Sequence, residues 1–303
     1  MPESPATVDE AQISAADAFS VLANQDRLDI LLALGDVNEG TAVNSLSFGE
    51  LHRRSGVADS GRFNYHLKQL LDVFVTKDEN DEYDLLYPGV VLYRAVRADL
   101  FTARPRTEPF DVGSDCQECG APLQGEYRNQ ILVVDCPDCG ALGLKYYVPP
   151  AVVRDGTVED LLAAGNVFSR RDAMTVANHV CPTCANRITH EVVPAAESTA
   201  LSEDVHDVVI VHYCFHCDHF LTTSVGTLLC YEPAVVAFLH DHGLDALRTP
   251  VWDLGIDSLV DVSLREREPP EILATVELDG EVLEVELDGD LDVVAVTGPR
   301  TRE

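Results

Sequence analysis

Eight of the nine cysteines form four Cys-x-x-Cys pairs, a spacing that favours a metal ion. Each pair places two thiolates on a tight turn, and Gly120 and Gly140 help to close the first two turns. Sixteen residues separate these two pairs, and the strand-like run 131–134 between them predicts a β-hairpin with one pair at each end. Four sulfurs would then surround one tetrahedral zinc in a zinc ribbon. The first set consists of Cys116, Cys119, Cys136 and Cys139.

The second set of pairs has a longer separation of 29 residues, but the apolar run 208–213 predicts a strand that leads into its last pair. This set consists of Cys181, Cys184, Cys214 and Cys217. Nearby histidines could replace a cysteine ligand or support the ligands, and surface or packing roles are the commoner alternative. These histidines are His190, His212, His216 and His219. The ninth cysteine, Cys230, fits a small buried apolar residue.

Two structural Zn²⁺ ions are the expected cofactors. Disulfides are the alternative, but no apolar run reaches 18 residues and the first thirty residues lack a secretory pattern. We therefore expect a cytoplasmic, reducing location without membrane contact. A zinc ion held by four thiolates keeps no position for a reactive water. Because no nucleophile–base pairing, phosphate loop or spaced carboxylate pair is visible either, we expect no enzyme and no catalytic residue.

Residues 47–87 carry the second candidate site. The whole chain has a net charge of −31, yet the segment from Ser47 to Lys77 contains five basic and only three acidic residues. Ser47 and Glu50 predict a capped helix that ends at Gly56, and Ser60 is expected to cap the next helix. Two strands at 73–77 and 83–87 would follow as a hairpin. A helix–turn–helix with a wing places donor side chains against DNA. The expected DNA contacts are Arg53, Ser60, Gly61, Arg62, Asn64, Tyr65, Lys68 and Lys77.

Two runs carry a resemblance to a known family. They read FSVLANQDRLDILLAL and FNYHLKQL, and they resemble the opening helix pair and the recognition helix of ArsR-type winged helix-turn-helix transcription regulators. His66, Leu67 and Leu70 stand at matching positions, while Gln25 replaces the family's proline. The helix GELHRRSG lacks the family's Cys-x-Cys site, so metal sensing there is not expected. The resemblance covers about residues 16–100. It implies binding to double-stranded DNA as a homodimer through helices at 15–22 and 90–100.

The acidic composition suggests an environment of high salt. There are 52 acidic residues against 21 basic ones, and only three of the basic residues are lysines. This balance resembles the proteins of halophilic archaea, in which dense carboxylates hold water and cations at molar salt. The order of a winged helix, two zinc ribbons and a β tail resembles that of haloarchaeal regulators with an ArsR-type head and a zinc-binding C-terminal region. The resemblance implies a sequence-specific regulator whose C-terminal region senses a signal or binds a protein partner. The alternative is a general initiation factor, similar to archaeal transcription factor E, that binds RNA polymerase.

The expected fold class is α+β, with a winged helix-turn-helix head, two four-cysteine zinc ribbons and a C-terminal antiparallel β segment. Short helices are expected at 157–165 and 169–180, and period-two alternation predicts four strands after residue 258. The expected divisions are a disordered N-terminus at 1–13, the winged domain at 14–101, a linker at 102–114, ribbon 1 at 115–148, a helical connector at 149–179, ribbon 2 at 180–231, a helix and connector at 232–258 and an acidic β tail at 259–303.

Overall fold

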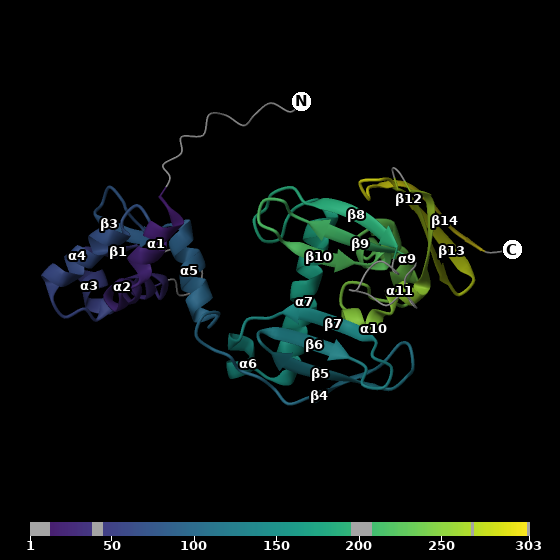
Figure 1. Ribbon diagram of the computed structural model, residues 1–303, viewed down its shortest axis with the longest axis horizontal. Coiled ribbons are helices and arrows are strands. Elements are labelled where there is room, and N and C mark those ends of the chain that lie inside the picture. Colours follow the sequence, from purple (N-terminus) through teal and green to yellow (C-terminus); the bar gives the residue numbers. More distant parts are fainter. Residues whose placement is uncertain (1–12, 38–44, 195–207, 268–269, 302–303) are drawn as a thin grey trace, which may run out of the picture. The chain divides into compact units, whose positions relative to one another are not determined.

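The computed structural model describes residues 13–37, 45–194, 208–267 and 270–301. The chain forms two compact units, Met1–Ala103 and Arg104–Glu303 (Figure 1). Both units combine helices with antiparallel sheets, which confirms the α+β class. The expected disordered segment at 1–13 lies outside the described residues except for Ile13. Among the described residues, no helix is both long and apolar enough to cross a membrane.

In its described residues, the first unit packs five helices around a small sheet with the strand order β1-β3-β2. The helices are α1 (Ala15–Leu22), α2 (Gln25–Gly35), α3 (Phe48–Ser55), α4 (Ser60–Leu70) and α5 (Tyr87–Arg97). The strands are β1 (Leu46–Ser47), β2 (Val75–Lys77) and β3 (Glu82–Leu85). The strand β1 was not expected, because a two-residue strand carries no alternation for a sequence to show.

Side-chain caps fix where the helices of the first unit begin. Ser47 accepts a hydrogen bond from the Glu50 N–H, as the sequence predicts, and Ser14 accepts one from the Asp17 N–H at the start of α1. The cap of α4 differs from the prediction. Asp59, not Ser60, accepts the Arg62 N–H at 2.7 Å, and Ser60 becomes the first residue of the helix. A carboxylate at this position also suits the positive end of the helix dipole.

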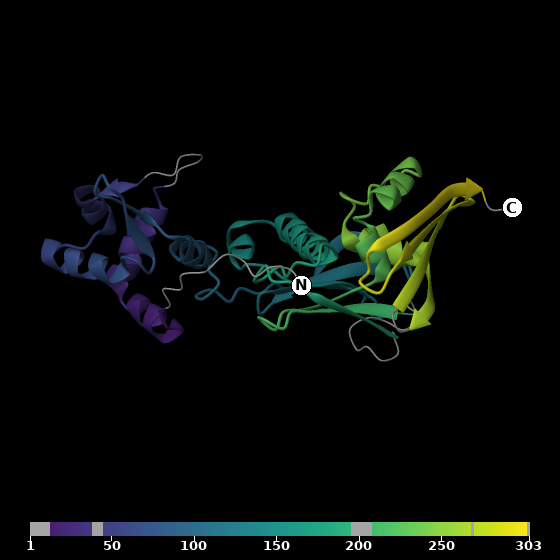
Figure 2. The same cartoon turned by 90° about the horizontal axis from the view of Figure 1, so that it is seen from above.

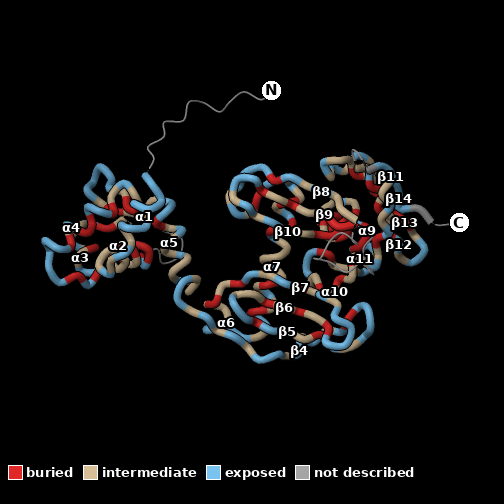
Figure 3. Tube along the Cα trace, in the orientation of Figure 1, coloured by how far each residue is buried: buried red, intermediate tan, exposed pale blue. Residues whose placement is uncertain are grey.

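One apolar core holds α2, α3 and α4 together (Figure 3). Its fully buried members recur at helical spacing, so each helix turns one face inward. These members include Ile30, Leu31, Leu34, Leu51, Phe63, Leu67 and Leu70. The remaining face of α4 is left toward solvent.

The part of the second unit that the structure describes contains three antiparallel sheets. The first has the order β4-β5-β6-β7 and comprises Phe110–Asp115, Pro122–Arg128, Ile131–Asp135 and Leu142–Tyr147. The second has the order β10-β9-β8 and comprises β8 (Thr189–Pro194), β9 (Val208–Tyr213) and β10 (Phe220–Thr223). The third has the order β11-β12-β13-β14 and comprises Val260–Arg267, Pro270–Leu278, Glu281–Leu287 and Val293–Thr301. All the segments predicted beyond residue 114 lie within this unit.

Helices lie between these sheets in the described part of the unit (Figure 2). They are α6 (Ala151–Asp155), α7 (Val158–Ala177), α8 (Val225–Leu229), α9 (Pro233–Asp241), α10 (Val251–Leu254) and α11 (Ile256–Leu259). Two predictions are corrected here. The expected linker at 102–114 contains most of strand β4, whose Phe110 pairs with Gly125. The two short helices expected near 157–180 are one continuous helix of 20 residues, α7.

Gly165 explains why α7 was predicted as two helices. Glycine weakens a helix interior, so Gly165-Asn166 read as a break. In the structure the helix needs a glycine there, because a Cβ at position 165 would lie 2.5 Å from Leu132 Cδ2 on β6. The close approach lets α7 pack on the first sheet, while Val176 near its other end belongs to the core of the second and third sheets. The helix therefore connects the two halves of the unit.

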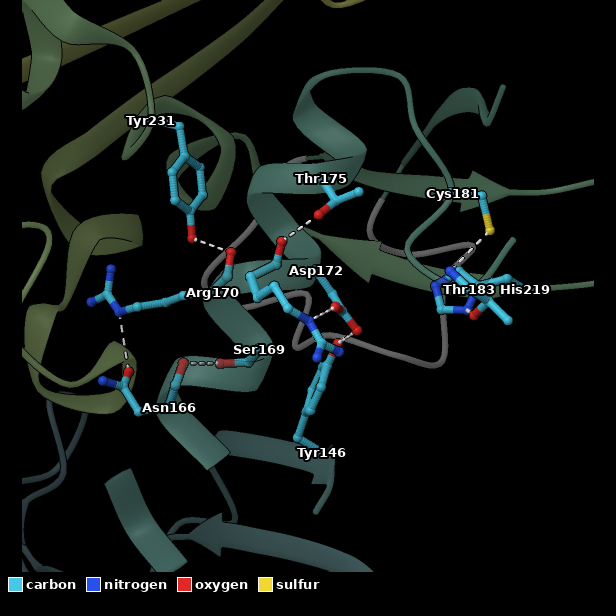
Figure 4. A network of polar contacts seen from close by, with 11 residues as sticks. Tyr146, Asn166, Ser169, Arg170, Asp172, Thr175, Cys181, Thr183, His219 and Tyr231 are labelled. Atoms are coloured by element: carbon cyan, nitrogen blue, oxygen red, sulfur yellow. Dashed lines mark hydrogen bonds and ion pairs between the residues drawn. The ribbon is translucent and has the colours of Figure 1, made fainter. Parts of the chain in front are cut away.

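Polar contacts from α7 fix the later part of the chain (Figure 4). The Arg170 guanidinium donates to the Ala246 carbonyl at 2.6 Å and to the Thr249 carbonyl. The Tyr231 hydroxyl donates to the Arg170 carbonyl at 2.9 Å. These contacts are part-buried, and they hold the chain on both sides of α9 against α7.

The third sheet completes the core of the second half. Its inner face buries alternate residues, among them Ile272, Ala274, Val276, Leu283 and Val285, in one cluster with Val208 and Ile210 of β9. On β13 the intervening residues are the acids Glu284 and Glu286, whereas on β12 they are Leu273 and Thr275. The predicted period-two alternation is confirmed, and the acidic segment is an integral part of the second unit's core.

Candidate metal centres and the exposed helix of the first unit

The first four-cysteine cluster lies where the β4–β5 and β6–β7 turns meet. The Cys116 and Cys139 sulfurs are 3.7 Å apart, and the Cys119 and Cys136 sulfurs are 3.5 Å apart. All four sulfurs lie within 4.8 Å of one another. Cys116 and Cys136 are buried, whereas Cys119 and Cys139 are exposed, so the cluster sits at the edge of the sheet.

The second cluster repeats this arrangement at the turn before β8 and the β9–β10 turn. The distance between the Cys181 and Cys217 sulfurs is 3.6 Å, and that between the Cys184 and Cys214 sulfurs is 3.5 Å. The four sulfurs again lie within 4.8 Å of one another. The strand predicted at 208–213 is β9, and it ends one residue before Cys214. The predicted ligand sets are therefore each brought together.

These distances fit a tetrahedral metal and exclude disulfides. Four sulfurs at about 2.3 Å from one zinc ion lie about 3.8 Å from each other, whereas a disulfide needs about 2.05 Å. All nine cysteines are free thiols. Four soft sulfur ligands in a tetrahedron are the set that zinc and similar ions prefer. The chain therefore has two sites of the zinc type.

A left-handed residue follows the second cysteine of every pair. The first cluster uses Gly120 and Gly140, with φ of 75° and 78°. The second cluster uses Ala185 and Asp218, with φ of 59° and 56°. Glycine marks this conformation only in the first two turns. The sequence therefore signals the turns of the second cluster less clearly. Backbone amides that point at sulfur then stabilise the thiolates.

Backbone hydrogen bonds prepare one thiolate in each cluster. The N–H of Asn186 lowers the pKa of the Cys184 thiol to about 6, and the N–H of Cys139 lowers the pKa of Cys136 to about 7. In the second cluster the Thr183 N–H also donates to the Cys181 sulfur at 3.4 Å, and the Thr183 hydroxyl meets His219 Nδ1 at 3.0 Å (Figure 4). His219 therefore supports the cluster from outside.

Two of the predicted histidines take part in a hydrogen-bonded chain away from the sulfurs. His190 Nδ1 lies 2.7 Å from His212 Nδ1, and His212 Nε2 lies 2.7 Å from the Thr223 hydroxyl. Burial lowers the pKa of His190 to about 4 and that of His212 to about 3, so both rings are neutral at physiological pH. His212 is fully buried, and His216 is exposed.

His179, Asp292 and Thr223 belong to the same series of hydrogen bonds, and none of them was predicted from the sequence. His179 Nδ1 lies 2.8 Å from His190 Nε2, and His179 Nε2 lies 3.0 Å from the carboxylate of Asp292. A signal was present: His179 and His212 each stand two residues before a cysteine pair of the second cluster. The first cluster has Ser114 and Val134 at those positions.

The eight predicted DNA contacts are accessible in the first unit. Seven are exposed, and Asn64 is partly buried. Gly61, Arg62, Asn64, Tyr65 and Lys68 all lie on α4, with the Tyr65 ring 60% exposed. Ser60 opens the same helix, Arg53 lies on α3, and Lys77 ends β2 of the hairpin.

Several of these cations are paired with acids. Arg53 binds Glu50, and Arg62 binds Asp26, which also meets His66 Nε2 at 3.1 Å. Lys77 Nζ lies 2.5 Å from the Asp81 carboxylate. The exposed face of α4 is therefore less positive than its sequence alone indicates.

The first and last helices of this unit expose apolar side chains. Among the described residues, α1 contributes no buried side chain, and its Phe19 is 71% exposed. In and just after α5, Val91 and Phe101 are exposed as well. These side chains are available to a second apolar surface.

These features define a protein with two tetrathiolate metal sites in a C-terminal α+β unit. The chain belongs to the family described as Domain of unknown function (DUF7351), which matches residues 113–293, more than half of the chain. A second family, described as Domain of unknown function (DUF7347), matches residues 15–96. The boundary between the two families agrees with the division of the structure near residue 103. No match was found among curated proteins or among solved structures.

Proposed function

We propose that this protein is a sequence-specific DNA-binding transcription regulator of the ArsR type, with a winged helix-turn-helix head and a zinc-stabilised C-terminal unit. The observation that carries the proposal is the order α3, tight turn, α4 and β2–β3 hairpin, in which α4 leaves a polar face open to solvent. In winged proteins of this order, the second helix enters the major groove. The thiolate clusters suit the reducing cytoplasm, where Zn²⁺ is the expected ion.

Amide shifts in an NMR titration of the full chain with duplex DNA test this function. We expect the perturbed amides to lie on α4 and on the hairpin at 75–85, with those of residues 104–303 unchanged. Perturbation confined to the second unit, or none at all from folded protein, would contradict the proposal.

The ion pair of Arg62 with Asp26 leads to a prediction of tighter DNA binding. Asp26→Asn removes a negative charge beside the recognition helix and keeps an acceptor for His66. A surface pair contributes about 0.2–1 kcal/mol, so releasing Arg62 should tighten DNA binding by about 1.4-fold to fivefold. Fluorescence anisotropy with a labelled duplex measures the change.

Asp29→Asn is the matched control, because it removes the same charge from the same helix α2 and Asp29 contacts Gln25 instead of Arg62. We expect a smaller gain from it. An equal gain in both variants would show that only net charge matters and that Arg62 makes no specific contact.

The exposed apolar side chains of α1 and α5 support a homodimer. We predict that the wild-type chain sediments as a dimer in molar KCl and that Phe19→Asp sediments as a monomer. Phe19 is 71% exposed, so the substitution should not disturb the fold of the protomer. Phe215→Asp, at a ring that is 78% exposed in the second unit, is the control and should remain dimeric. A monomeric wild type, or the same behaviour in both variants, would refute this interface.

Exposed rings at the second cluster support a protein partner for the C-terminal unit. Phe215 and Phe220 are 78% and 58% exposed, and Tyr213 contacts Phe215 edge-on at 4.8 Å between ring centroids. The equivalent turn of the first cluster carries Pro137 and Asp138 instead. If that partner is RNA polymerase, the chain would act as a general initiation factor similar to transcription factor E. Co-purification with polymerase without a fixed DNA site would favour this alternative.

A further inference from the structure

Five side chains from different parts of the second unit form one continuous series of hydrogen bonds. It runs from Asp292 through His179, His190 and His212 to Thr223, with heavy-atom distances of 3.0, 2.8, 2.7 and 2.7 Å. We call these five residues the histidine chain. Asp292 is exposed, whereas His212 is fully buried, so the chain connects the surface with the core.

The ring nitrogens can be assigned from the chemistry of the two ends. A carboxylate only accepts hydrogen bonds, so with neutral rings His179 Nε2–H must donate to Asp292. His179 Nδ1 then accepts from His190 Nε2–H, and His190 Nδ1 accepts from His212 Nδ1–H. His212 Nε2 is left to accept from the Thr223 hydroxyl. The four hydrogen bonds of the histidine chain join eight atoms. With neutral rings, all eight are satisfied only when every donor points toward the Asp292 end.

The histidine chain joins the two halves of the second metal site. His179 precedes Cys181 by two residues, and His212 precedes Cys214 by two residues. His190 lies between them on β8, directly opposite His212 on β9. The histidine chain therefore holds the backbone segments that lead into the two cysteine pairs of the second cluster. Groups that hydrogen-bond to metal ligands commonly change metal affinity by tenfold or more, and here the support would reach the cysteines through the backbone.

The other end of the chain reaches the third sheet. Asp292 lies in the turn between β13 and β14, where the Asp288 carboxylate accepts the N–H groups of both Asp290 and Asp292 at 3.0 Å. This turn fixes the position of the Asp292 carboxylate. Asp292 therefore links the turn of the third sheet to His179.

His179 also adopts a conformation that argues for a specific role of its ring. It follows the end of α7 with φ of 58°, the left-handed position that usually favours glycine after a helix. A histidine there is less favourable for the backbone, and its imidazole is the part that the structure uses.

From these observations we infer that the histidine chain is a positioning device that couples metal retention at the second four-cysteine site to the docking of the C-terminal sheet. The first site has no counterpart among the described residues, since Ser114 and Val134 replace the two histidines. The inference does not depend on DNA binding. It requires only that both clusters hold a metal ion.

The experiment uses the full-length chain loaded with ¹¹³Cd²⁺, for which the two sites should give separate NMR signals. Cys184→Ser assigns the signal of the second site, because it removes one of its ligands. After addition of a chelator, Asp292→Ala should speed metal loss from the second site by about tenfold and leave the first unchanged. Asp292→Asn keeps an acceptor and should stay close to wild type. Asp290→Ala, which removes a charge from the same turn, is the matched control.

Two further readouts separate this role from general stability. His179→Gly relieves the strain of the left-handed backbone. If His179 served only the fold, metal loss would be unchanged or slower in this variant. The inference expects faster loss from the second site alone. Nitrogen-15 shifts should show N–H at Nε2 of His179 and His190 and at Nδ1 of His212. Equal acceleration at both sites, no acceleration in Asp292→Ala, or the opposite pattern of ring protonation would each overturn the inference.

Discussion

Replacement of Cys119 by Ser should leave one metal ion per chain instead of two and unfold the first sheet of the second unit. The three remaining thiolates cannot complete the tetrahedron, and small zinc-bound folds draw about 10–16 kcal/mol from the metal. That sheet is small, and the two buried cysteines of the first cluster belong to its core. Native mass spectrometry gives the number of ions, and NMR shows which residues keep their dispersion.

The rest of the molecule should survive this substitution. Residues up to 103 form a separate compact unit with its own core, and the second cluster belongs to a different core from the first. The control is Cys230→Ser, since Cys230 is buried but belongs to neither cluster. It should keep two ions. Loss of both ions from Cys119→Ser would contradict the independence of the two cores within the second unit. Loss of helical signal from the first unit would contradict the separation of the two units.

The second large effect is expected on α4. Arg62→Ala and Asn64→Ala should each abolish discrimination between a selected site and random DNA, while the fold and the metal content remain unchanged. A good contact to a base edge contributes about 1–3 kcal/mol of discrimination, which is about fivefold to 150-fold in relative affinity. Competition binding between the two duplexes measures this ratio.

Lys68→Ala separates phosphate binding from base recognition. Lys68 is exposed on the same helix, and loss of a phosphate contact should weaken binding to all sequences alike and reduce the salt dependence by about one ion. Arg128→Ala, an exposed arginine in the second unit, should change neither quantity. Unchanged selectivity in both the Arg62 and Asn64 variants would show that α4 does not contact bases.

Much of the fold follows from local signals in the sequence. Cysteine spacing predicted both clusters, because two turns at the ends of a hairpin bring their sulfurs together whatever surrounds them. Period-two alternation predicted the last four strands, since each strand has one face in the core. Ser47 was recognised as a cap because a side-chain oxygen before an apolar helix acts within one turn.

The features that sequence analysis missed depend on contacts between distant residues. Gly165 was interpreted as a helix break. The residue that approaches it, Leu132, lies 33 positions earlier in the chain, so the sequence near Gly165 does not show why a glycine is needed. The pairing of Arg62 with Asp26 joins residues 36 apart, and Asp292 lies 113 residues from His179. The repeated His-x-Cys spacing was a local sign of the histidine chain, but it does not reveal that His190 joins the two rings.

A binding-site selection tests the central claim most directly. The full-length protein, shown to be folded and to carry two metal ions, is mixed with random duplex DNA in molar KCl, and the retained DNA is sequenced. At that salt the Debye length is about 3 Å, so nonspecific attraction is screened and base contacts dominate. We predict recovery of one motif with two-fold symmetry. Recovery of no motif from such protein would contradict a sequence-specific regulator.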